Sequence, residues 1–207
     1  MSRSETSAPR RRASTRHSPR QVTLKTAPAT RTAQKKRTGY DRNPPDRTTP
    51  TWLTPPDLLR ALGPFDLDPC TPADMPWRTA KRMLTEVDDG LATPWPKRSF
   101  VFHNPPYGAH QGAWMKKAAE HGHGVSLVFC RMDTAWAHEH VLKHRNTAAV
   151  VFLRGRVRFH RPDGTQAGTS GAPSMLIAHG DEAAERLKRA VESGAIRGAF
   201  VPLRHRR

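Results

Sequence analysis

The chain has 207 residues, a length typical of one domain, and its 35 Lys and Arg against 18 Asp and Glu give a formal net charge of +17. This charge favours a polyanionic partner such as nucleic acid. Two cysteines, Cys70 and Cys130, exclude the disulfide framework of a small secreted fold and any zinc finger built on cysteine pairs. The longest apolar runs fall far short of the ~20 residues of a membrane span, so we expect a soluble protein of the cytoplasm.

The first fifty residues differ in composition from the rest. Residues 1–50 are rich in Ser, Thr, Pro, Lys and Arg and contain almost no large apolar side chain. Such a segment cannot bury enough surface to offset the entropy of ordering, so we predict a disordered basic arm ahead of a folded domain over residues 51–207. The clusters Arg10–Arg12 and Lys35–Arg37 suit phosphate contacts that do not read sequence, although a merely solubilising tail is the alternative.

From Trp52 onward, helical and strand patterns alternate. Thr54 can cap, and Pro56 can begin, a short helix that carries Leu58, Leu59 and Leu62. The elements that follow are strands over 65–68 and 99–103, a helix over 114–120, a strand over 125–129, a helix over 134–144 and a strand over 148–153. This alternation predicts an α/β fold with a mainly parallel sheet.

The last third of the chain favours antiparallel structure. Residues 156–160 and 174–178 flank the turn sequence Arg161–Gly164 and a loop rich in Gly, Ser and Thr, which predicts a terminal antiparallel hairpin. An amphipathic helix over 181–193 and a short apolar run over 199–201 complete the domain.

The most informative stretch is Asn104-Pro105-Pro106-Tyr107, which directly follows a buried strand. Two prolines stiffen this turn, so the Asn104 side chain and the Pro105 carbonyl can act as fixed hydrogen-bond acceptors beside an aromatic ring. An exocyclic amine that donates both of its N–H groups to such acceptors becomes tetrahedral and can attack an electrophilic methyl group. Tyr107 would stack on the flat group that carries the amine. A Pro-rich turn that only ends a strand is the alternative.

In these residues the chain resembles the phage-type, Dam-like DNA N6-adenine methyltransferases, which have the class I, Rossmann-like fold and use S-adenosylmethionine. The segments that carry the resemblance lie between residues 51 and 180, in the order of that family: Trp52-Leu53-Thr54-Pro55, Phe65-Asp66-Leu67-Asp68-Pro69-Cys70, Asp89-Gly90-Leu91 with Trp95, Asn104-Pro105-Pro106-Tyr107-Gly108 with Trp114, and Gly155-Arg156-Val157-Arg158-Phe159. The resemblance implies a double-stranded DNA substrate with a flipped adenine, and a bacterial or phage-infected host cytoplasm as the setting. Many class I enzymes have a Gly-rich turn where this chain has Asp68-Pro69-Cys70-Thr71.

The resemblance and the position of the first strand indicate where the cofactor binds. Ligands of open α/β sheets lie beyond the carboxyl ends of the strands, where an acid can pair with the ammonium group of the cofactor. Asp66 and Asp68 are the candidates, and Asp68 is favoured because it lies nearer the strand end; Pro69 and Cys70 are expected beside it. A helix cap is the alternative for Asp68. Asp89 would accept a hydrogen bond from the adenine or ribose of the cofactor, or simply form an Asp-Gly turn.

Three arginines are candidates for binding DNA. Arg154, Arg156 and Arg158 are expected to line the DNA cleft, unless they only make an edge strand soluble. No metal is expected, because His140 and His144 lack the glutamate of the zinc-protease pattern. The sequence thus predicts a site-specific adenine N6-methyltransferase of DNA. Methylation of RNA adenine or protein glutamine, and a non-catalytic nucleic-acid-binding protein on the same scaffold, stay open, and no feature sets the oligomeric state.

Overall fold

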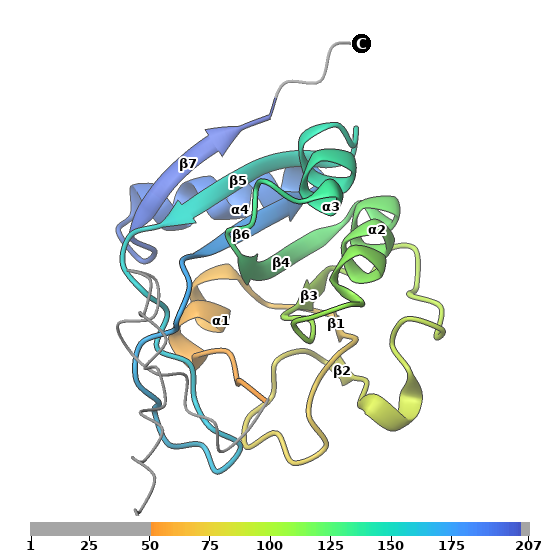
Figure 1. Cartoon of the computed structure of the whole chain (residues 1–207), viewed down its shortest axis with the longest axis vertical. Coiled ribbons are helices and arrows are strands. Elements are labelled where there is room, and N and C mark those ends of the chain that lie inside the picture. The colour runs from red at the N-terminus through yellow and green to blue at the C-terminus, as the bar shows by residue number, and fades with distance from the viewer. Residues whose placement is uncertain (1–50, 204–207) are drawn as a thin grey trace, which may run out of the picture. The chain divides into compact units, whose positions relative to one another are not determined.

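A computed structural model describes residues 51–203; the predicted basic arm over 1–50 and the last four residues lie outside this range. The described chain forms one mixed sheet with helices on both faces (Figure 1). Its elements in chain order are α1 (Pro56–Leu62), β1 (Leu67–Asp68), β2 (Arg82–Met83), the 3-10 helix η1 (Glu86–Asp88), β3 (Val101–His103), α2 (Gln111–His121), β4 (Gly124–Phe129), α3 (Ala135–Ala137), the π-helix η2 (His138–Leu142), β5 (Thr147–Leu153), β6 (Ser174–His179), α4 (Asp181–Glu192) and β7 (Gly198–Pro202).

The seven strands are arranged in the order β2-β1-β3-β4-β6-β5-β7. The first four strands of this order pair in parallel, while β6 pairs antiparallel with both β4 and β5, and β7 pairs antiparallel with β5. The chain leaves β1 to form β2 on one side of it and returns to form β3 on the other side. The carboxyl ends of β1 and β3 therefore lie at a topological switch point, where open α/β sheets bind their ligands.

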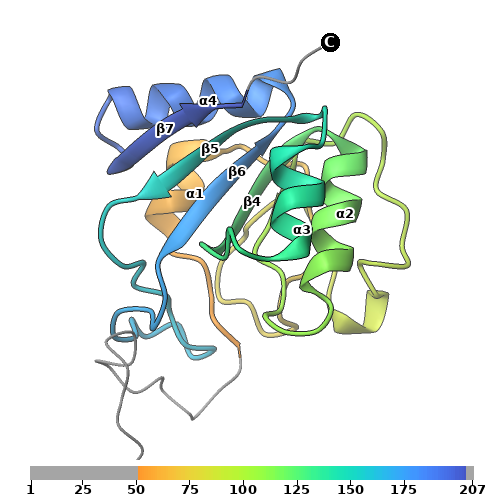
Figure 2. The ribbon, with the colours of Figure 1, turned by 45° about the horizontal axis from the view of Figure 1, so that its top comes forward.

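Two layers of helices bury the two faces of the sheet (Figure 2). On one face, α1 and α4 pack over a core that includes Leu62, Phe102 and Leu187. On the other face, Met115 of α2 and Val141 of η2 pack against the central strands. Every residue of β6 is buried, which is typical of a strand that has neighbours on both edges and helices on both faces.

The structure confirms the predicted strands near 125–129 and 148–153 and the helix near 181–193, and it corrects three other predictions. The predicted terminal hairpin is wrong: residues 174–178 pair within β6, and residues 156–160 form no strand. The backbone there instead bonds to residues 166–170, as in Ala167 N to Phe159 O at 2.8 Å. The helix expected over 134–144 consists of α3 and η2, and α1 begins after Pro55 without a cap from Thr54.

Candidate active site

A cavity of about 530 Å³ opens at the carboxyl ends of β1, β2 and β3. Four segments and one helix contribute its walls: the residues before α1, the loops that follow these three strands, and α2. The lining residues are Thr51, Trp52, Pro69, Cys70, Thr71, Pro72, Thr85, Glu86, Asp89, Gly90, Asn104, Pro105, Pro106, Tyr107 and Trp114. The structure thus gathers the four predicted catalytic residues and three of the five predicted cofactor residues around one space.

Hydrogen bonds fix the orientation of the Asn104 amide at this cavity. Its Nδ2 donates to the carbonyl oxygen of Trp52 at 3.1 Å, and its Oδ1 accepts from the hydroxyl of Tyr107 at 3.1 Å. A carboxamide oxygen has two lone pairs, so Oδ1 keeps one acceptor position beyond the bond from Tyr107. The side chain is therefore held as an acceptor.

The segment before α1 supplies the partner of Asn104, which sequence reasoning missed. Leu53 and His160 form an antiparallel bridge, with Leu53 N to His160 O at 2.9 Å and His160 N to Leu53 O at 3.0 Å. The Leu53 side chain is 1% exposed, so burial also anchors the segment. This bridge places the Trp52 carbonyl beside the loop after β3.

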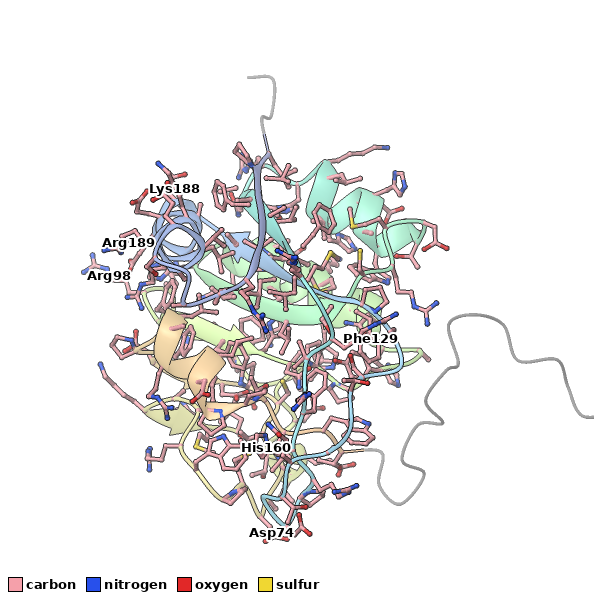
Figure 3. The ribbon with its side chains drawn as sticks, turned by 90° about the vertical axis from the view of Figure 1, so that its left-hand side faces the viewer. Asp74, Arg98, Phe129, His160, Lys188 and Arg189 are labelled. Atoms are coloured by element: carbon pink, nitrogen blue, oxygen red, sulfur yellow. The ribbon has the colours of Figure 1, made fainter. Side chains whose placement is uncertain are left out.

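Tyr107 stacks on Phe129, the last residue of β4. Their ring centroids lie 4.0 Å apart with an interplanar angle of 6°. Burial raises the pKa of the Tyr107 phenol above its ordinary value, so the hydroxyl stays protonated and can donate to Asn104. Because Phe129 covers one face of the Tyr107 ring, a further planar group can stack only on the other face. Figure 3 labels Phe129 and also His160, the residue after β5 that bridges to Leu53.

Asp68 ends β1 and is 4% exposed. The Cys70 backbone N–H donates to its Oδ1 at 3.1 Å, and burial raises the pKa of the carboxyl to about 6. Within residues 51–203, no Lys or Arg forms an ion pair with it. Asp68 lines a smaller hollow that shares Trp52, Cys70 and Asn104 with the main cavity.

Asp66 is directed elsewhere. Its Oδ1 accepts from Lys81 Nζ at 2.8 Å, and its Oδ2 accepts from the backbone N–H of Phe100 at 2.9 Å. The hydrogen bond from Lys81, followed by that from Phe100, lowers the pKa of the Asp66 carboxyl. The structure does not bring this side chain to the cavity, and its contacts fix the start of β1 instead.

The loop after η1 forms another wall. Asp89 has a φ of +45°, and its Oδ1 accepts from the N–H groups of Leu91 and Ala92, each at 3.1 Å. Gly90 lies so close to the chain after β1 that a Cβ there would be 1.8 Å from the Pro69 carbonyl oxygen. Glu86 also lines this side, although the sequence analysis did not name it. The sequence did contain a signal for Glu86: it is an acid about 20 residues beyond the first strand, where the ribose-binding acids of nucleotide-binding folds occur.

The three candidate DNA-binding arginines follow β5 and are exposed. Arg156 and Arg158 flank Val157, which is partly buried against the core. Exposure therefore alternates along these three residues, but they form no strand, so the edge strand considered for them is absent. Within the described range no cluster of three or more His, Cys, Asp or Glu is placed to hold a metal ion. No helix between residues 51 and 203 is long and apolar enough to cross a membrane.

The family model for DNA N-6-adenine-methyltransferase (Dam) matches residues 42–190, which is more than two thirds of the chain. The matched range includes every residue of the cavity and the three arginines after β5. No curated protein gives a significant match, and neither does any solved structure.

Proposed function

Because the chain belongs to the DNA N-6-adenine-methyltransferase (Dam) family, we propose that it methylates the N6 amine of an adenine flipped out of double-stranded DNA, with S-adenosylmethionine as the donor. The observation that carries this proposal is the fixed Asn104 amide at the mouth of the cavity. These two hydrogen bonds leave one lone pair of Oδ1 for the N–H of a target amine.

In this reaction Asn104 Oδ1 and the Pro105 carbonyl oxygen would accept the two N–H groups of the adenine amine. When both N–H groups are hydrogen-bonded to these two acceptors, the nitrogen lone pair is no longer delocalised into the ring. The nitrogen can then attack a methyl group. No strong base is needed, because the amine would lose its proton to solvent only after the N–C bond has formed and the bond between the methyl carbon and the sulfur of the donor has broken. The free face of Tyr107 would hold the purine ring by stacking, a contact worth about 1–3 kcal/mol.

The described residues fit S-adenosylmethionine. A buried carboxylate with no cationic partner among residues 51–203, that of Asp68, suits the ammonium group of the cofactor. Glu86 and Asp89 place carboxylates along the main cavity, where they suit ribose hydroxyls or the adenine amine. When bound, the cofactor supplies an electrophilic methyl group on its sulfonium. The β1/β3 switch point supports a class I, Rossmann-like assignment for the sheet.

Arg154, Arg156 and Arg158 would bind DNA phosphates next to the flipped base. All three are exposed, and they follow β5, whose carboxyl end points to the same edge of the sheet as that of β4. Phosphate contacts of this kind position a duplex without reading its sequence.

Incubation of the full chain with radiolabelled S-adenosylmethionine and, in parallel, DNA, RNA or a protein mixture tests this proposal. The proposal expects label on N6 of adenine in DNA, and loss of the label with Asn104→Ala. Label on RNA or on glutamine would transfer the function to another planar amine. Binding of DNA without any transfer would indicate a non-catalytic protein on the methyltransferase scaffold.

A further inference from the structure

Lys117 of α2 extends to the loop that forms the Asp89 side of the cavity. Its Nζ donates to three backbone carbonyl oxygens: Gly90 at 3.1 Å, Leu91 at 2.6 Å and Thr93 at 2.7 Å. The same ammonium lies 5.1 Å from the centroid of the Trp95 ring. A lysine has three N–H groups on one compact cation, so these three acceptors use its whole donor capacity.

The loop itself is a single helical turn, and it is capped at both ends. Thr93 N donates to Asp89 O at 2.8 Å, which closes the turn, and the Asp89 carboxylate accepts two N–H groups at its start. The carbonyl groups at the end of a helical turn have no partners within the turn, and a cation is a favourable partner for them. Lys117 is the cation that binds these carbonyl groups, and it lies on α2, 24 to 27 residues after them in the chain.

The position of this turn determines the shape of the cavity. A Cβ on Gly90 would lie 1.8 Å from the Pro69 oxygen and 2.9 Å from a ring carbon of Trp114. The cavity is lined by Pro69, Gly90 and Trp114. The loop after β1, the turn after η1 and helix α2 therefore meet at Gly90. Trp114 lies three residues before Lys117 on α2, which places both side chains on one face of the helix.

We propose that Lys117 is a positioning residue: it locks the turn Asp89–Thr93 against Pro69 and Trp114 and thereby forms the wall that binds the nucleoside part of S-adenosylmethionine. This role rests on the proposed function. Without the ammonium, the carbonyl groups of Leu91 and Thr93 lose the donor that Lys117 gives them, and that of Gly90 keeps only the bond from the Trp95 indole N–H at 2.9 Å. The turn then loses its link to α2 and can move away from Pro69. Partial burial lowers the pKa of the Lys117 amine, while nearby Asp89 opposes this change.

The test compares Lys117→Met with Lys116→Met in the full chain. Both variants lose one positive charge from α2, but Lys116 is 60% exposed and its nearest acid is Glu120 at 3.8 Å. Amide hydrogen exchange should accelerate in residues 89–93 of Lys117→Met only. Calorimetry should show at least tenfold weaker binding of S-adenosylmethionine, and the KM for the cofactor should rise while kcat stays within about threefold.

Three results would overturn this role. Unchanged exchange in residues 89–93 would show that Lys117 does not hold the turn, and unchanged cofactor affinity would show that the turn does not matter for binding. Faster exchange throughout the domain would make Lys117 a general stabilising residue. A wild-type chain that binds no S-adenosylmethionine would instead refute the proposed function, and the exchange comparison would still decide whether Lys117 holds the turn.

Discussion

Replacement of Asp68 by asparagine should make the ligand-free chain more stable and its cofactor binding weaker. The wild-type carboxyl is buried with no cation from residues 51–203 beside it, and burial raises its pKa to about 6 from an ordinary 3.8. Asparagine has nearly the same shape and keeps an oxygen for the N–H of Cys70, but it carries no charge to desolvate. The difference in unfolding free energy between the two proteins therefore measures the cost of burying the Asp68 charge, because the packing around the side chain stays nearly the same.

The size of the effect follows from the two pKa values. The folded chain binds a proton at Asp68 more tightly than the unfolded chain does, so this group favours folding at low pH and loses that contribution as the pH rises through about 6. The free energy of unfolding of Asp68→Asn should exceed that of wild type by less than about 1 kcal/mol at pH 4 and by about 3 kcal/mol at pH 7.5. Taking the difference at each pH cancels the titration of every other group that the two proteins share.

Urea denaturation of both proteins between pH 4 and pH 8, without and with S-adenosylmethionine, measures this difference. Without cofactor the gap should widen with pH; with cofactor it should shrink or reverse, because only the wild-type carboxylate gains an ammonium partner. A gap that does not change with pH would refute the assignment of a raised pKa to Asp68. Equal stabilisation of both proteins by the cofactor would show that Asp68 does not bind the ammonium group and only accepts from the Cys70 N–H; the helix cap considered from the sequence is wrong, because no helix lies between β1 and β2.

Three further predictions concern other parts of the chain. Gly90→Ala would bring a Cβ to 1.8 Å from the Pro69 oxygen, so calorimetry should show cofactor binding weakened at least tenfold, whereas Gly168→Ala, with no atom within 4 Å of its Cβ, should bind as wild type does. Burial lowers the pKa values of His103, to about 3, and of His121 and His179, so the unfolded chain takes up protons first. The urea midpoint of Asp68→Asn, which lacks the opposing titration of Asp68, should therefore fall as the pH drops below about 6.5; a constant midpoint would contradict this sign. Deletion of residues 1–48, which contain thirteen Lys or Arg, should weaken DNA binding and flatten its salt dependence by about 0.9 in slope per lost phosphate contact, with the methylated site unchanged; an altered site would show that these residues read bases.

Local patterns in the sequence predicted the parts of the site that are contiguous in the chain. Asn104 to Tyr107 follow a buried apolar strand and precede a helix, so their place at a strand end was expected, and the structure puts all four at the cavity. Pro69 and Cys70 were expected at the end of the first strand, and Asp89 from the family resemblance; all three also line the cavity.

Long-range pairings were not predictable in the same way. The bridge between Leu53 and His160 joins segments more than 100 residues apart, and nothing in either segment specifies the other. Strand β2 has only two residues and no apolar run, so periodicity gave no sign of it, and Glu86 after it was indicated only by its distance from the first strand. The hairpin prediction failed because residues 174–179 are buried on both faces, and a uniformly apolar strand does not reveal its neighbours.

Single-turnover methyl transfer by Asn104→Ala shows whether Asn104 accepts the amine of the target adenine. With saturating S-adenosylmethionine and DNA, we expect a rate at least tenfold below wild type, which is a loss of about 1.4 kcal/mol or more in transition-state stabilisation. The cofactor Kd should stay within a few-fold of wild type. A variant that transfers methyl groups to DNA adenine at more than a tenth of the wild-type rate would contradict this role of Asn104.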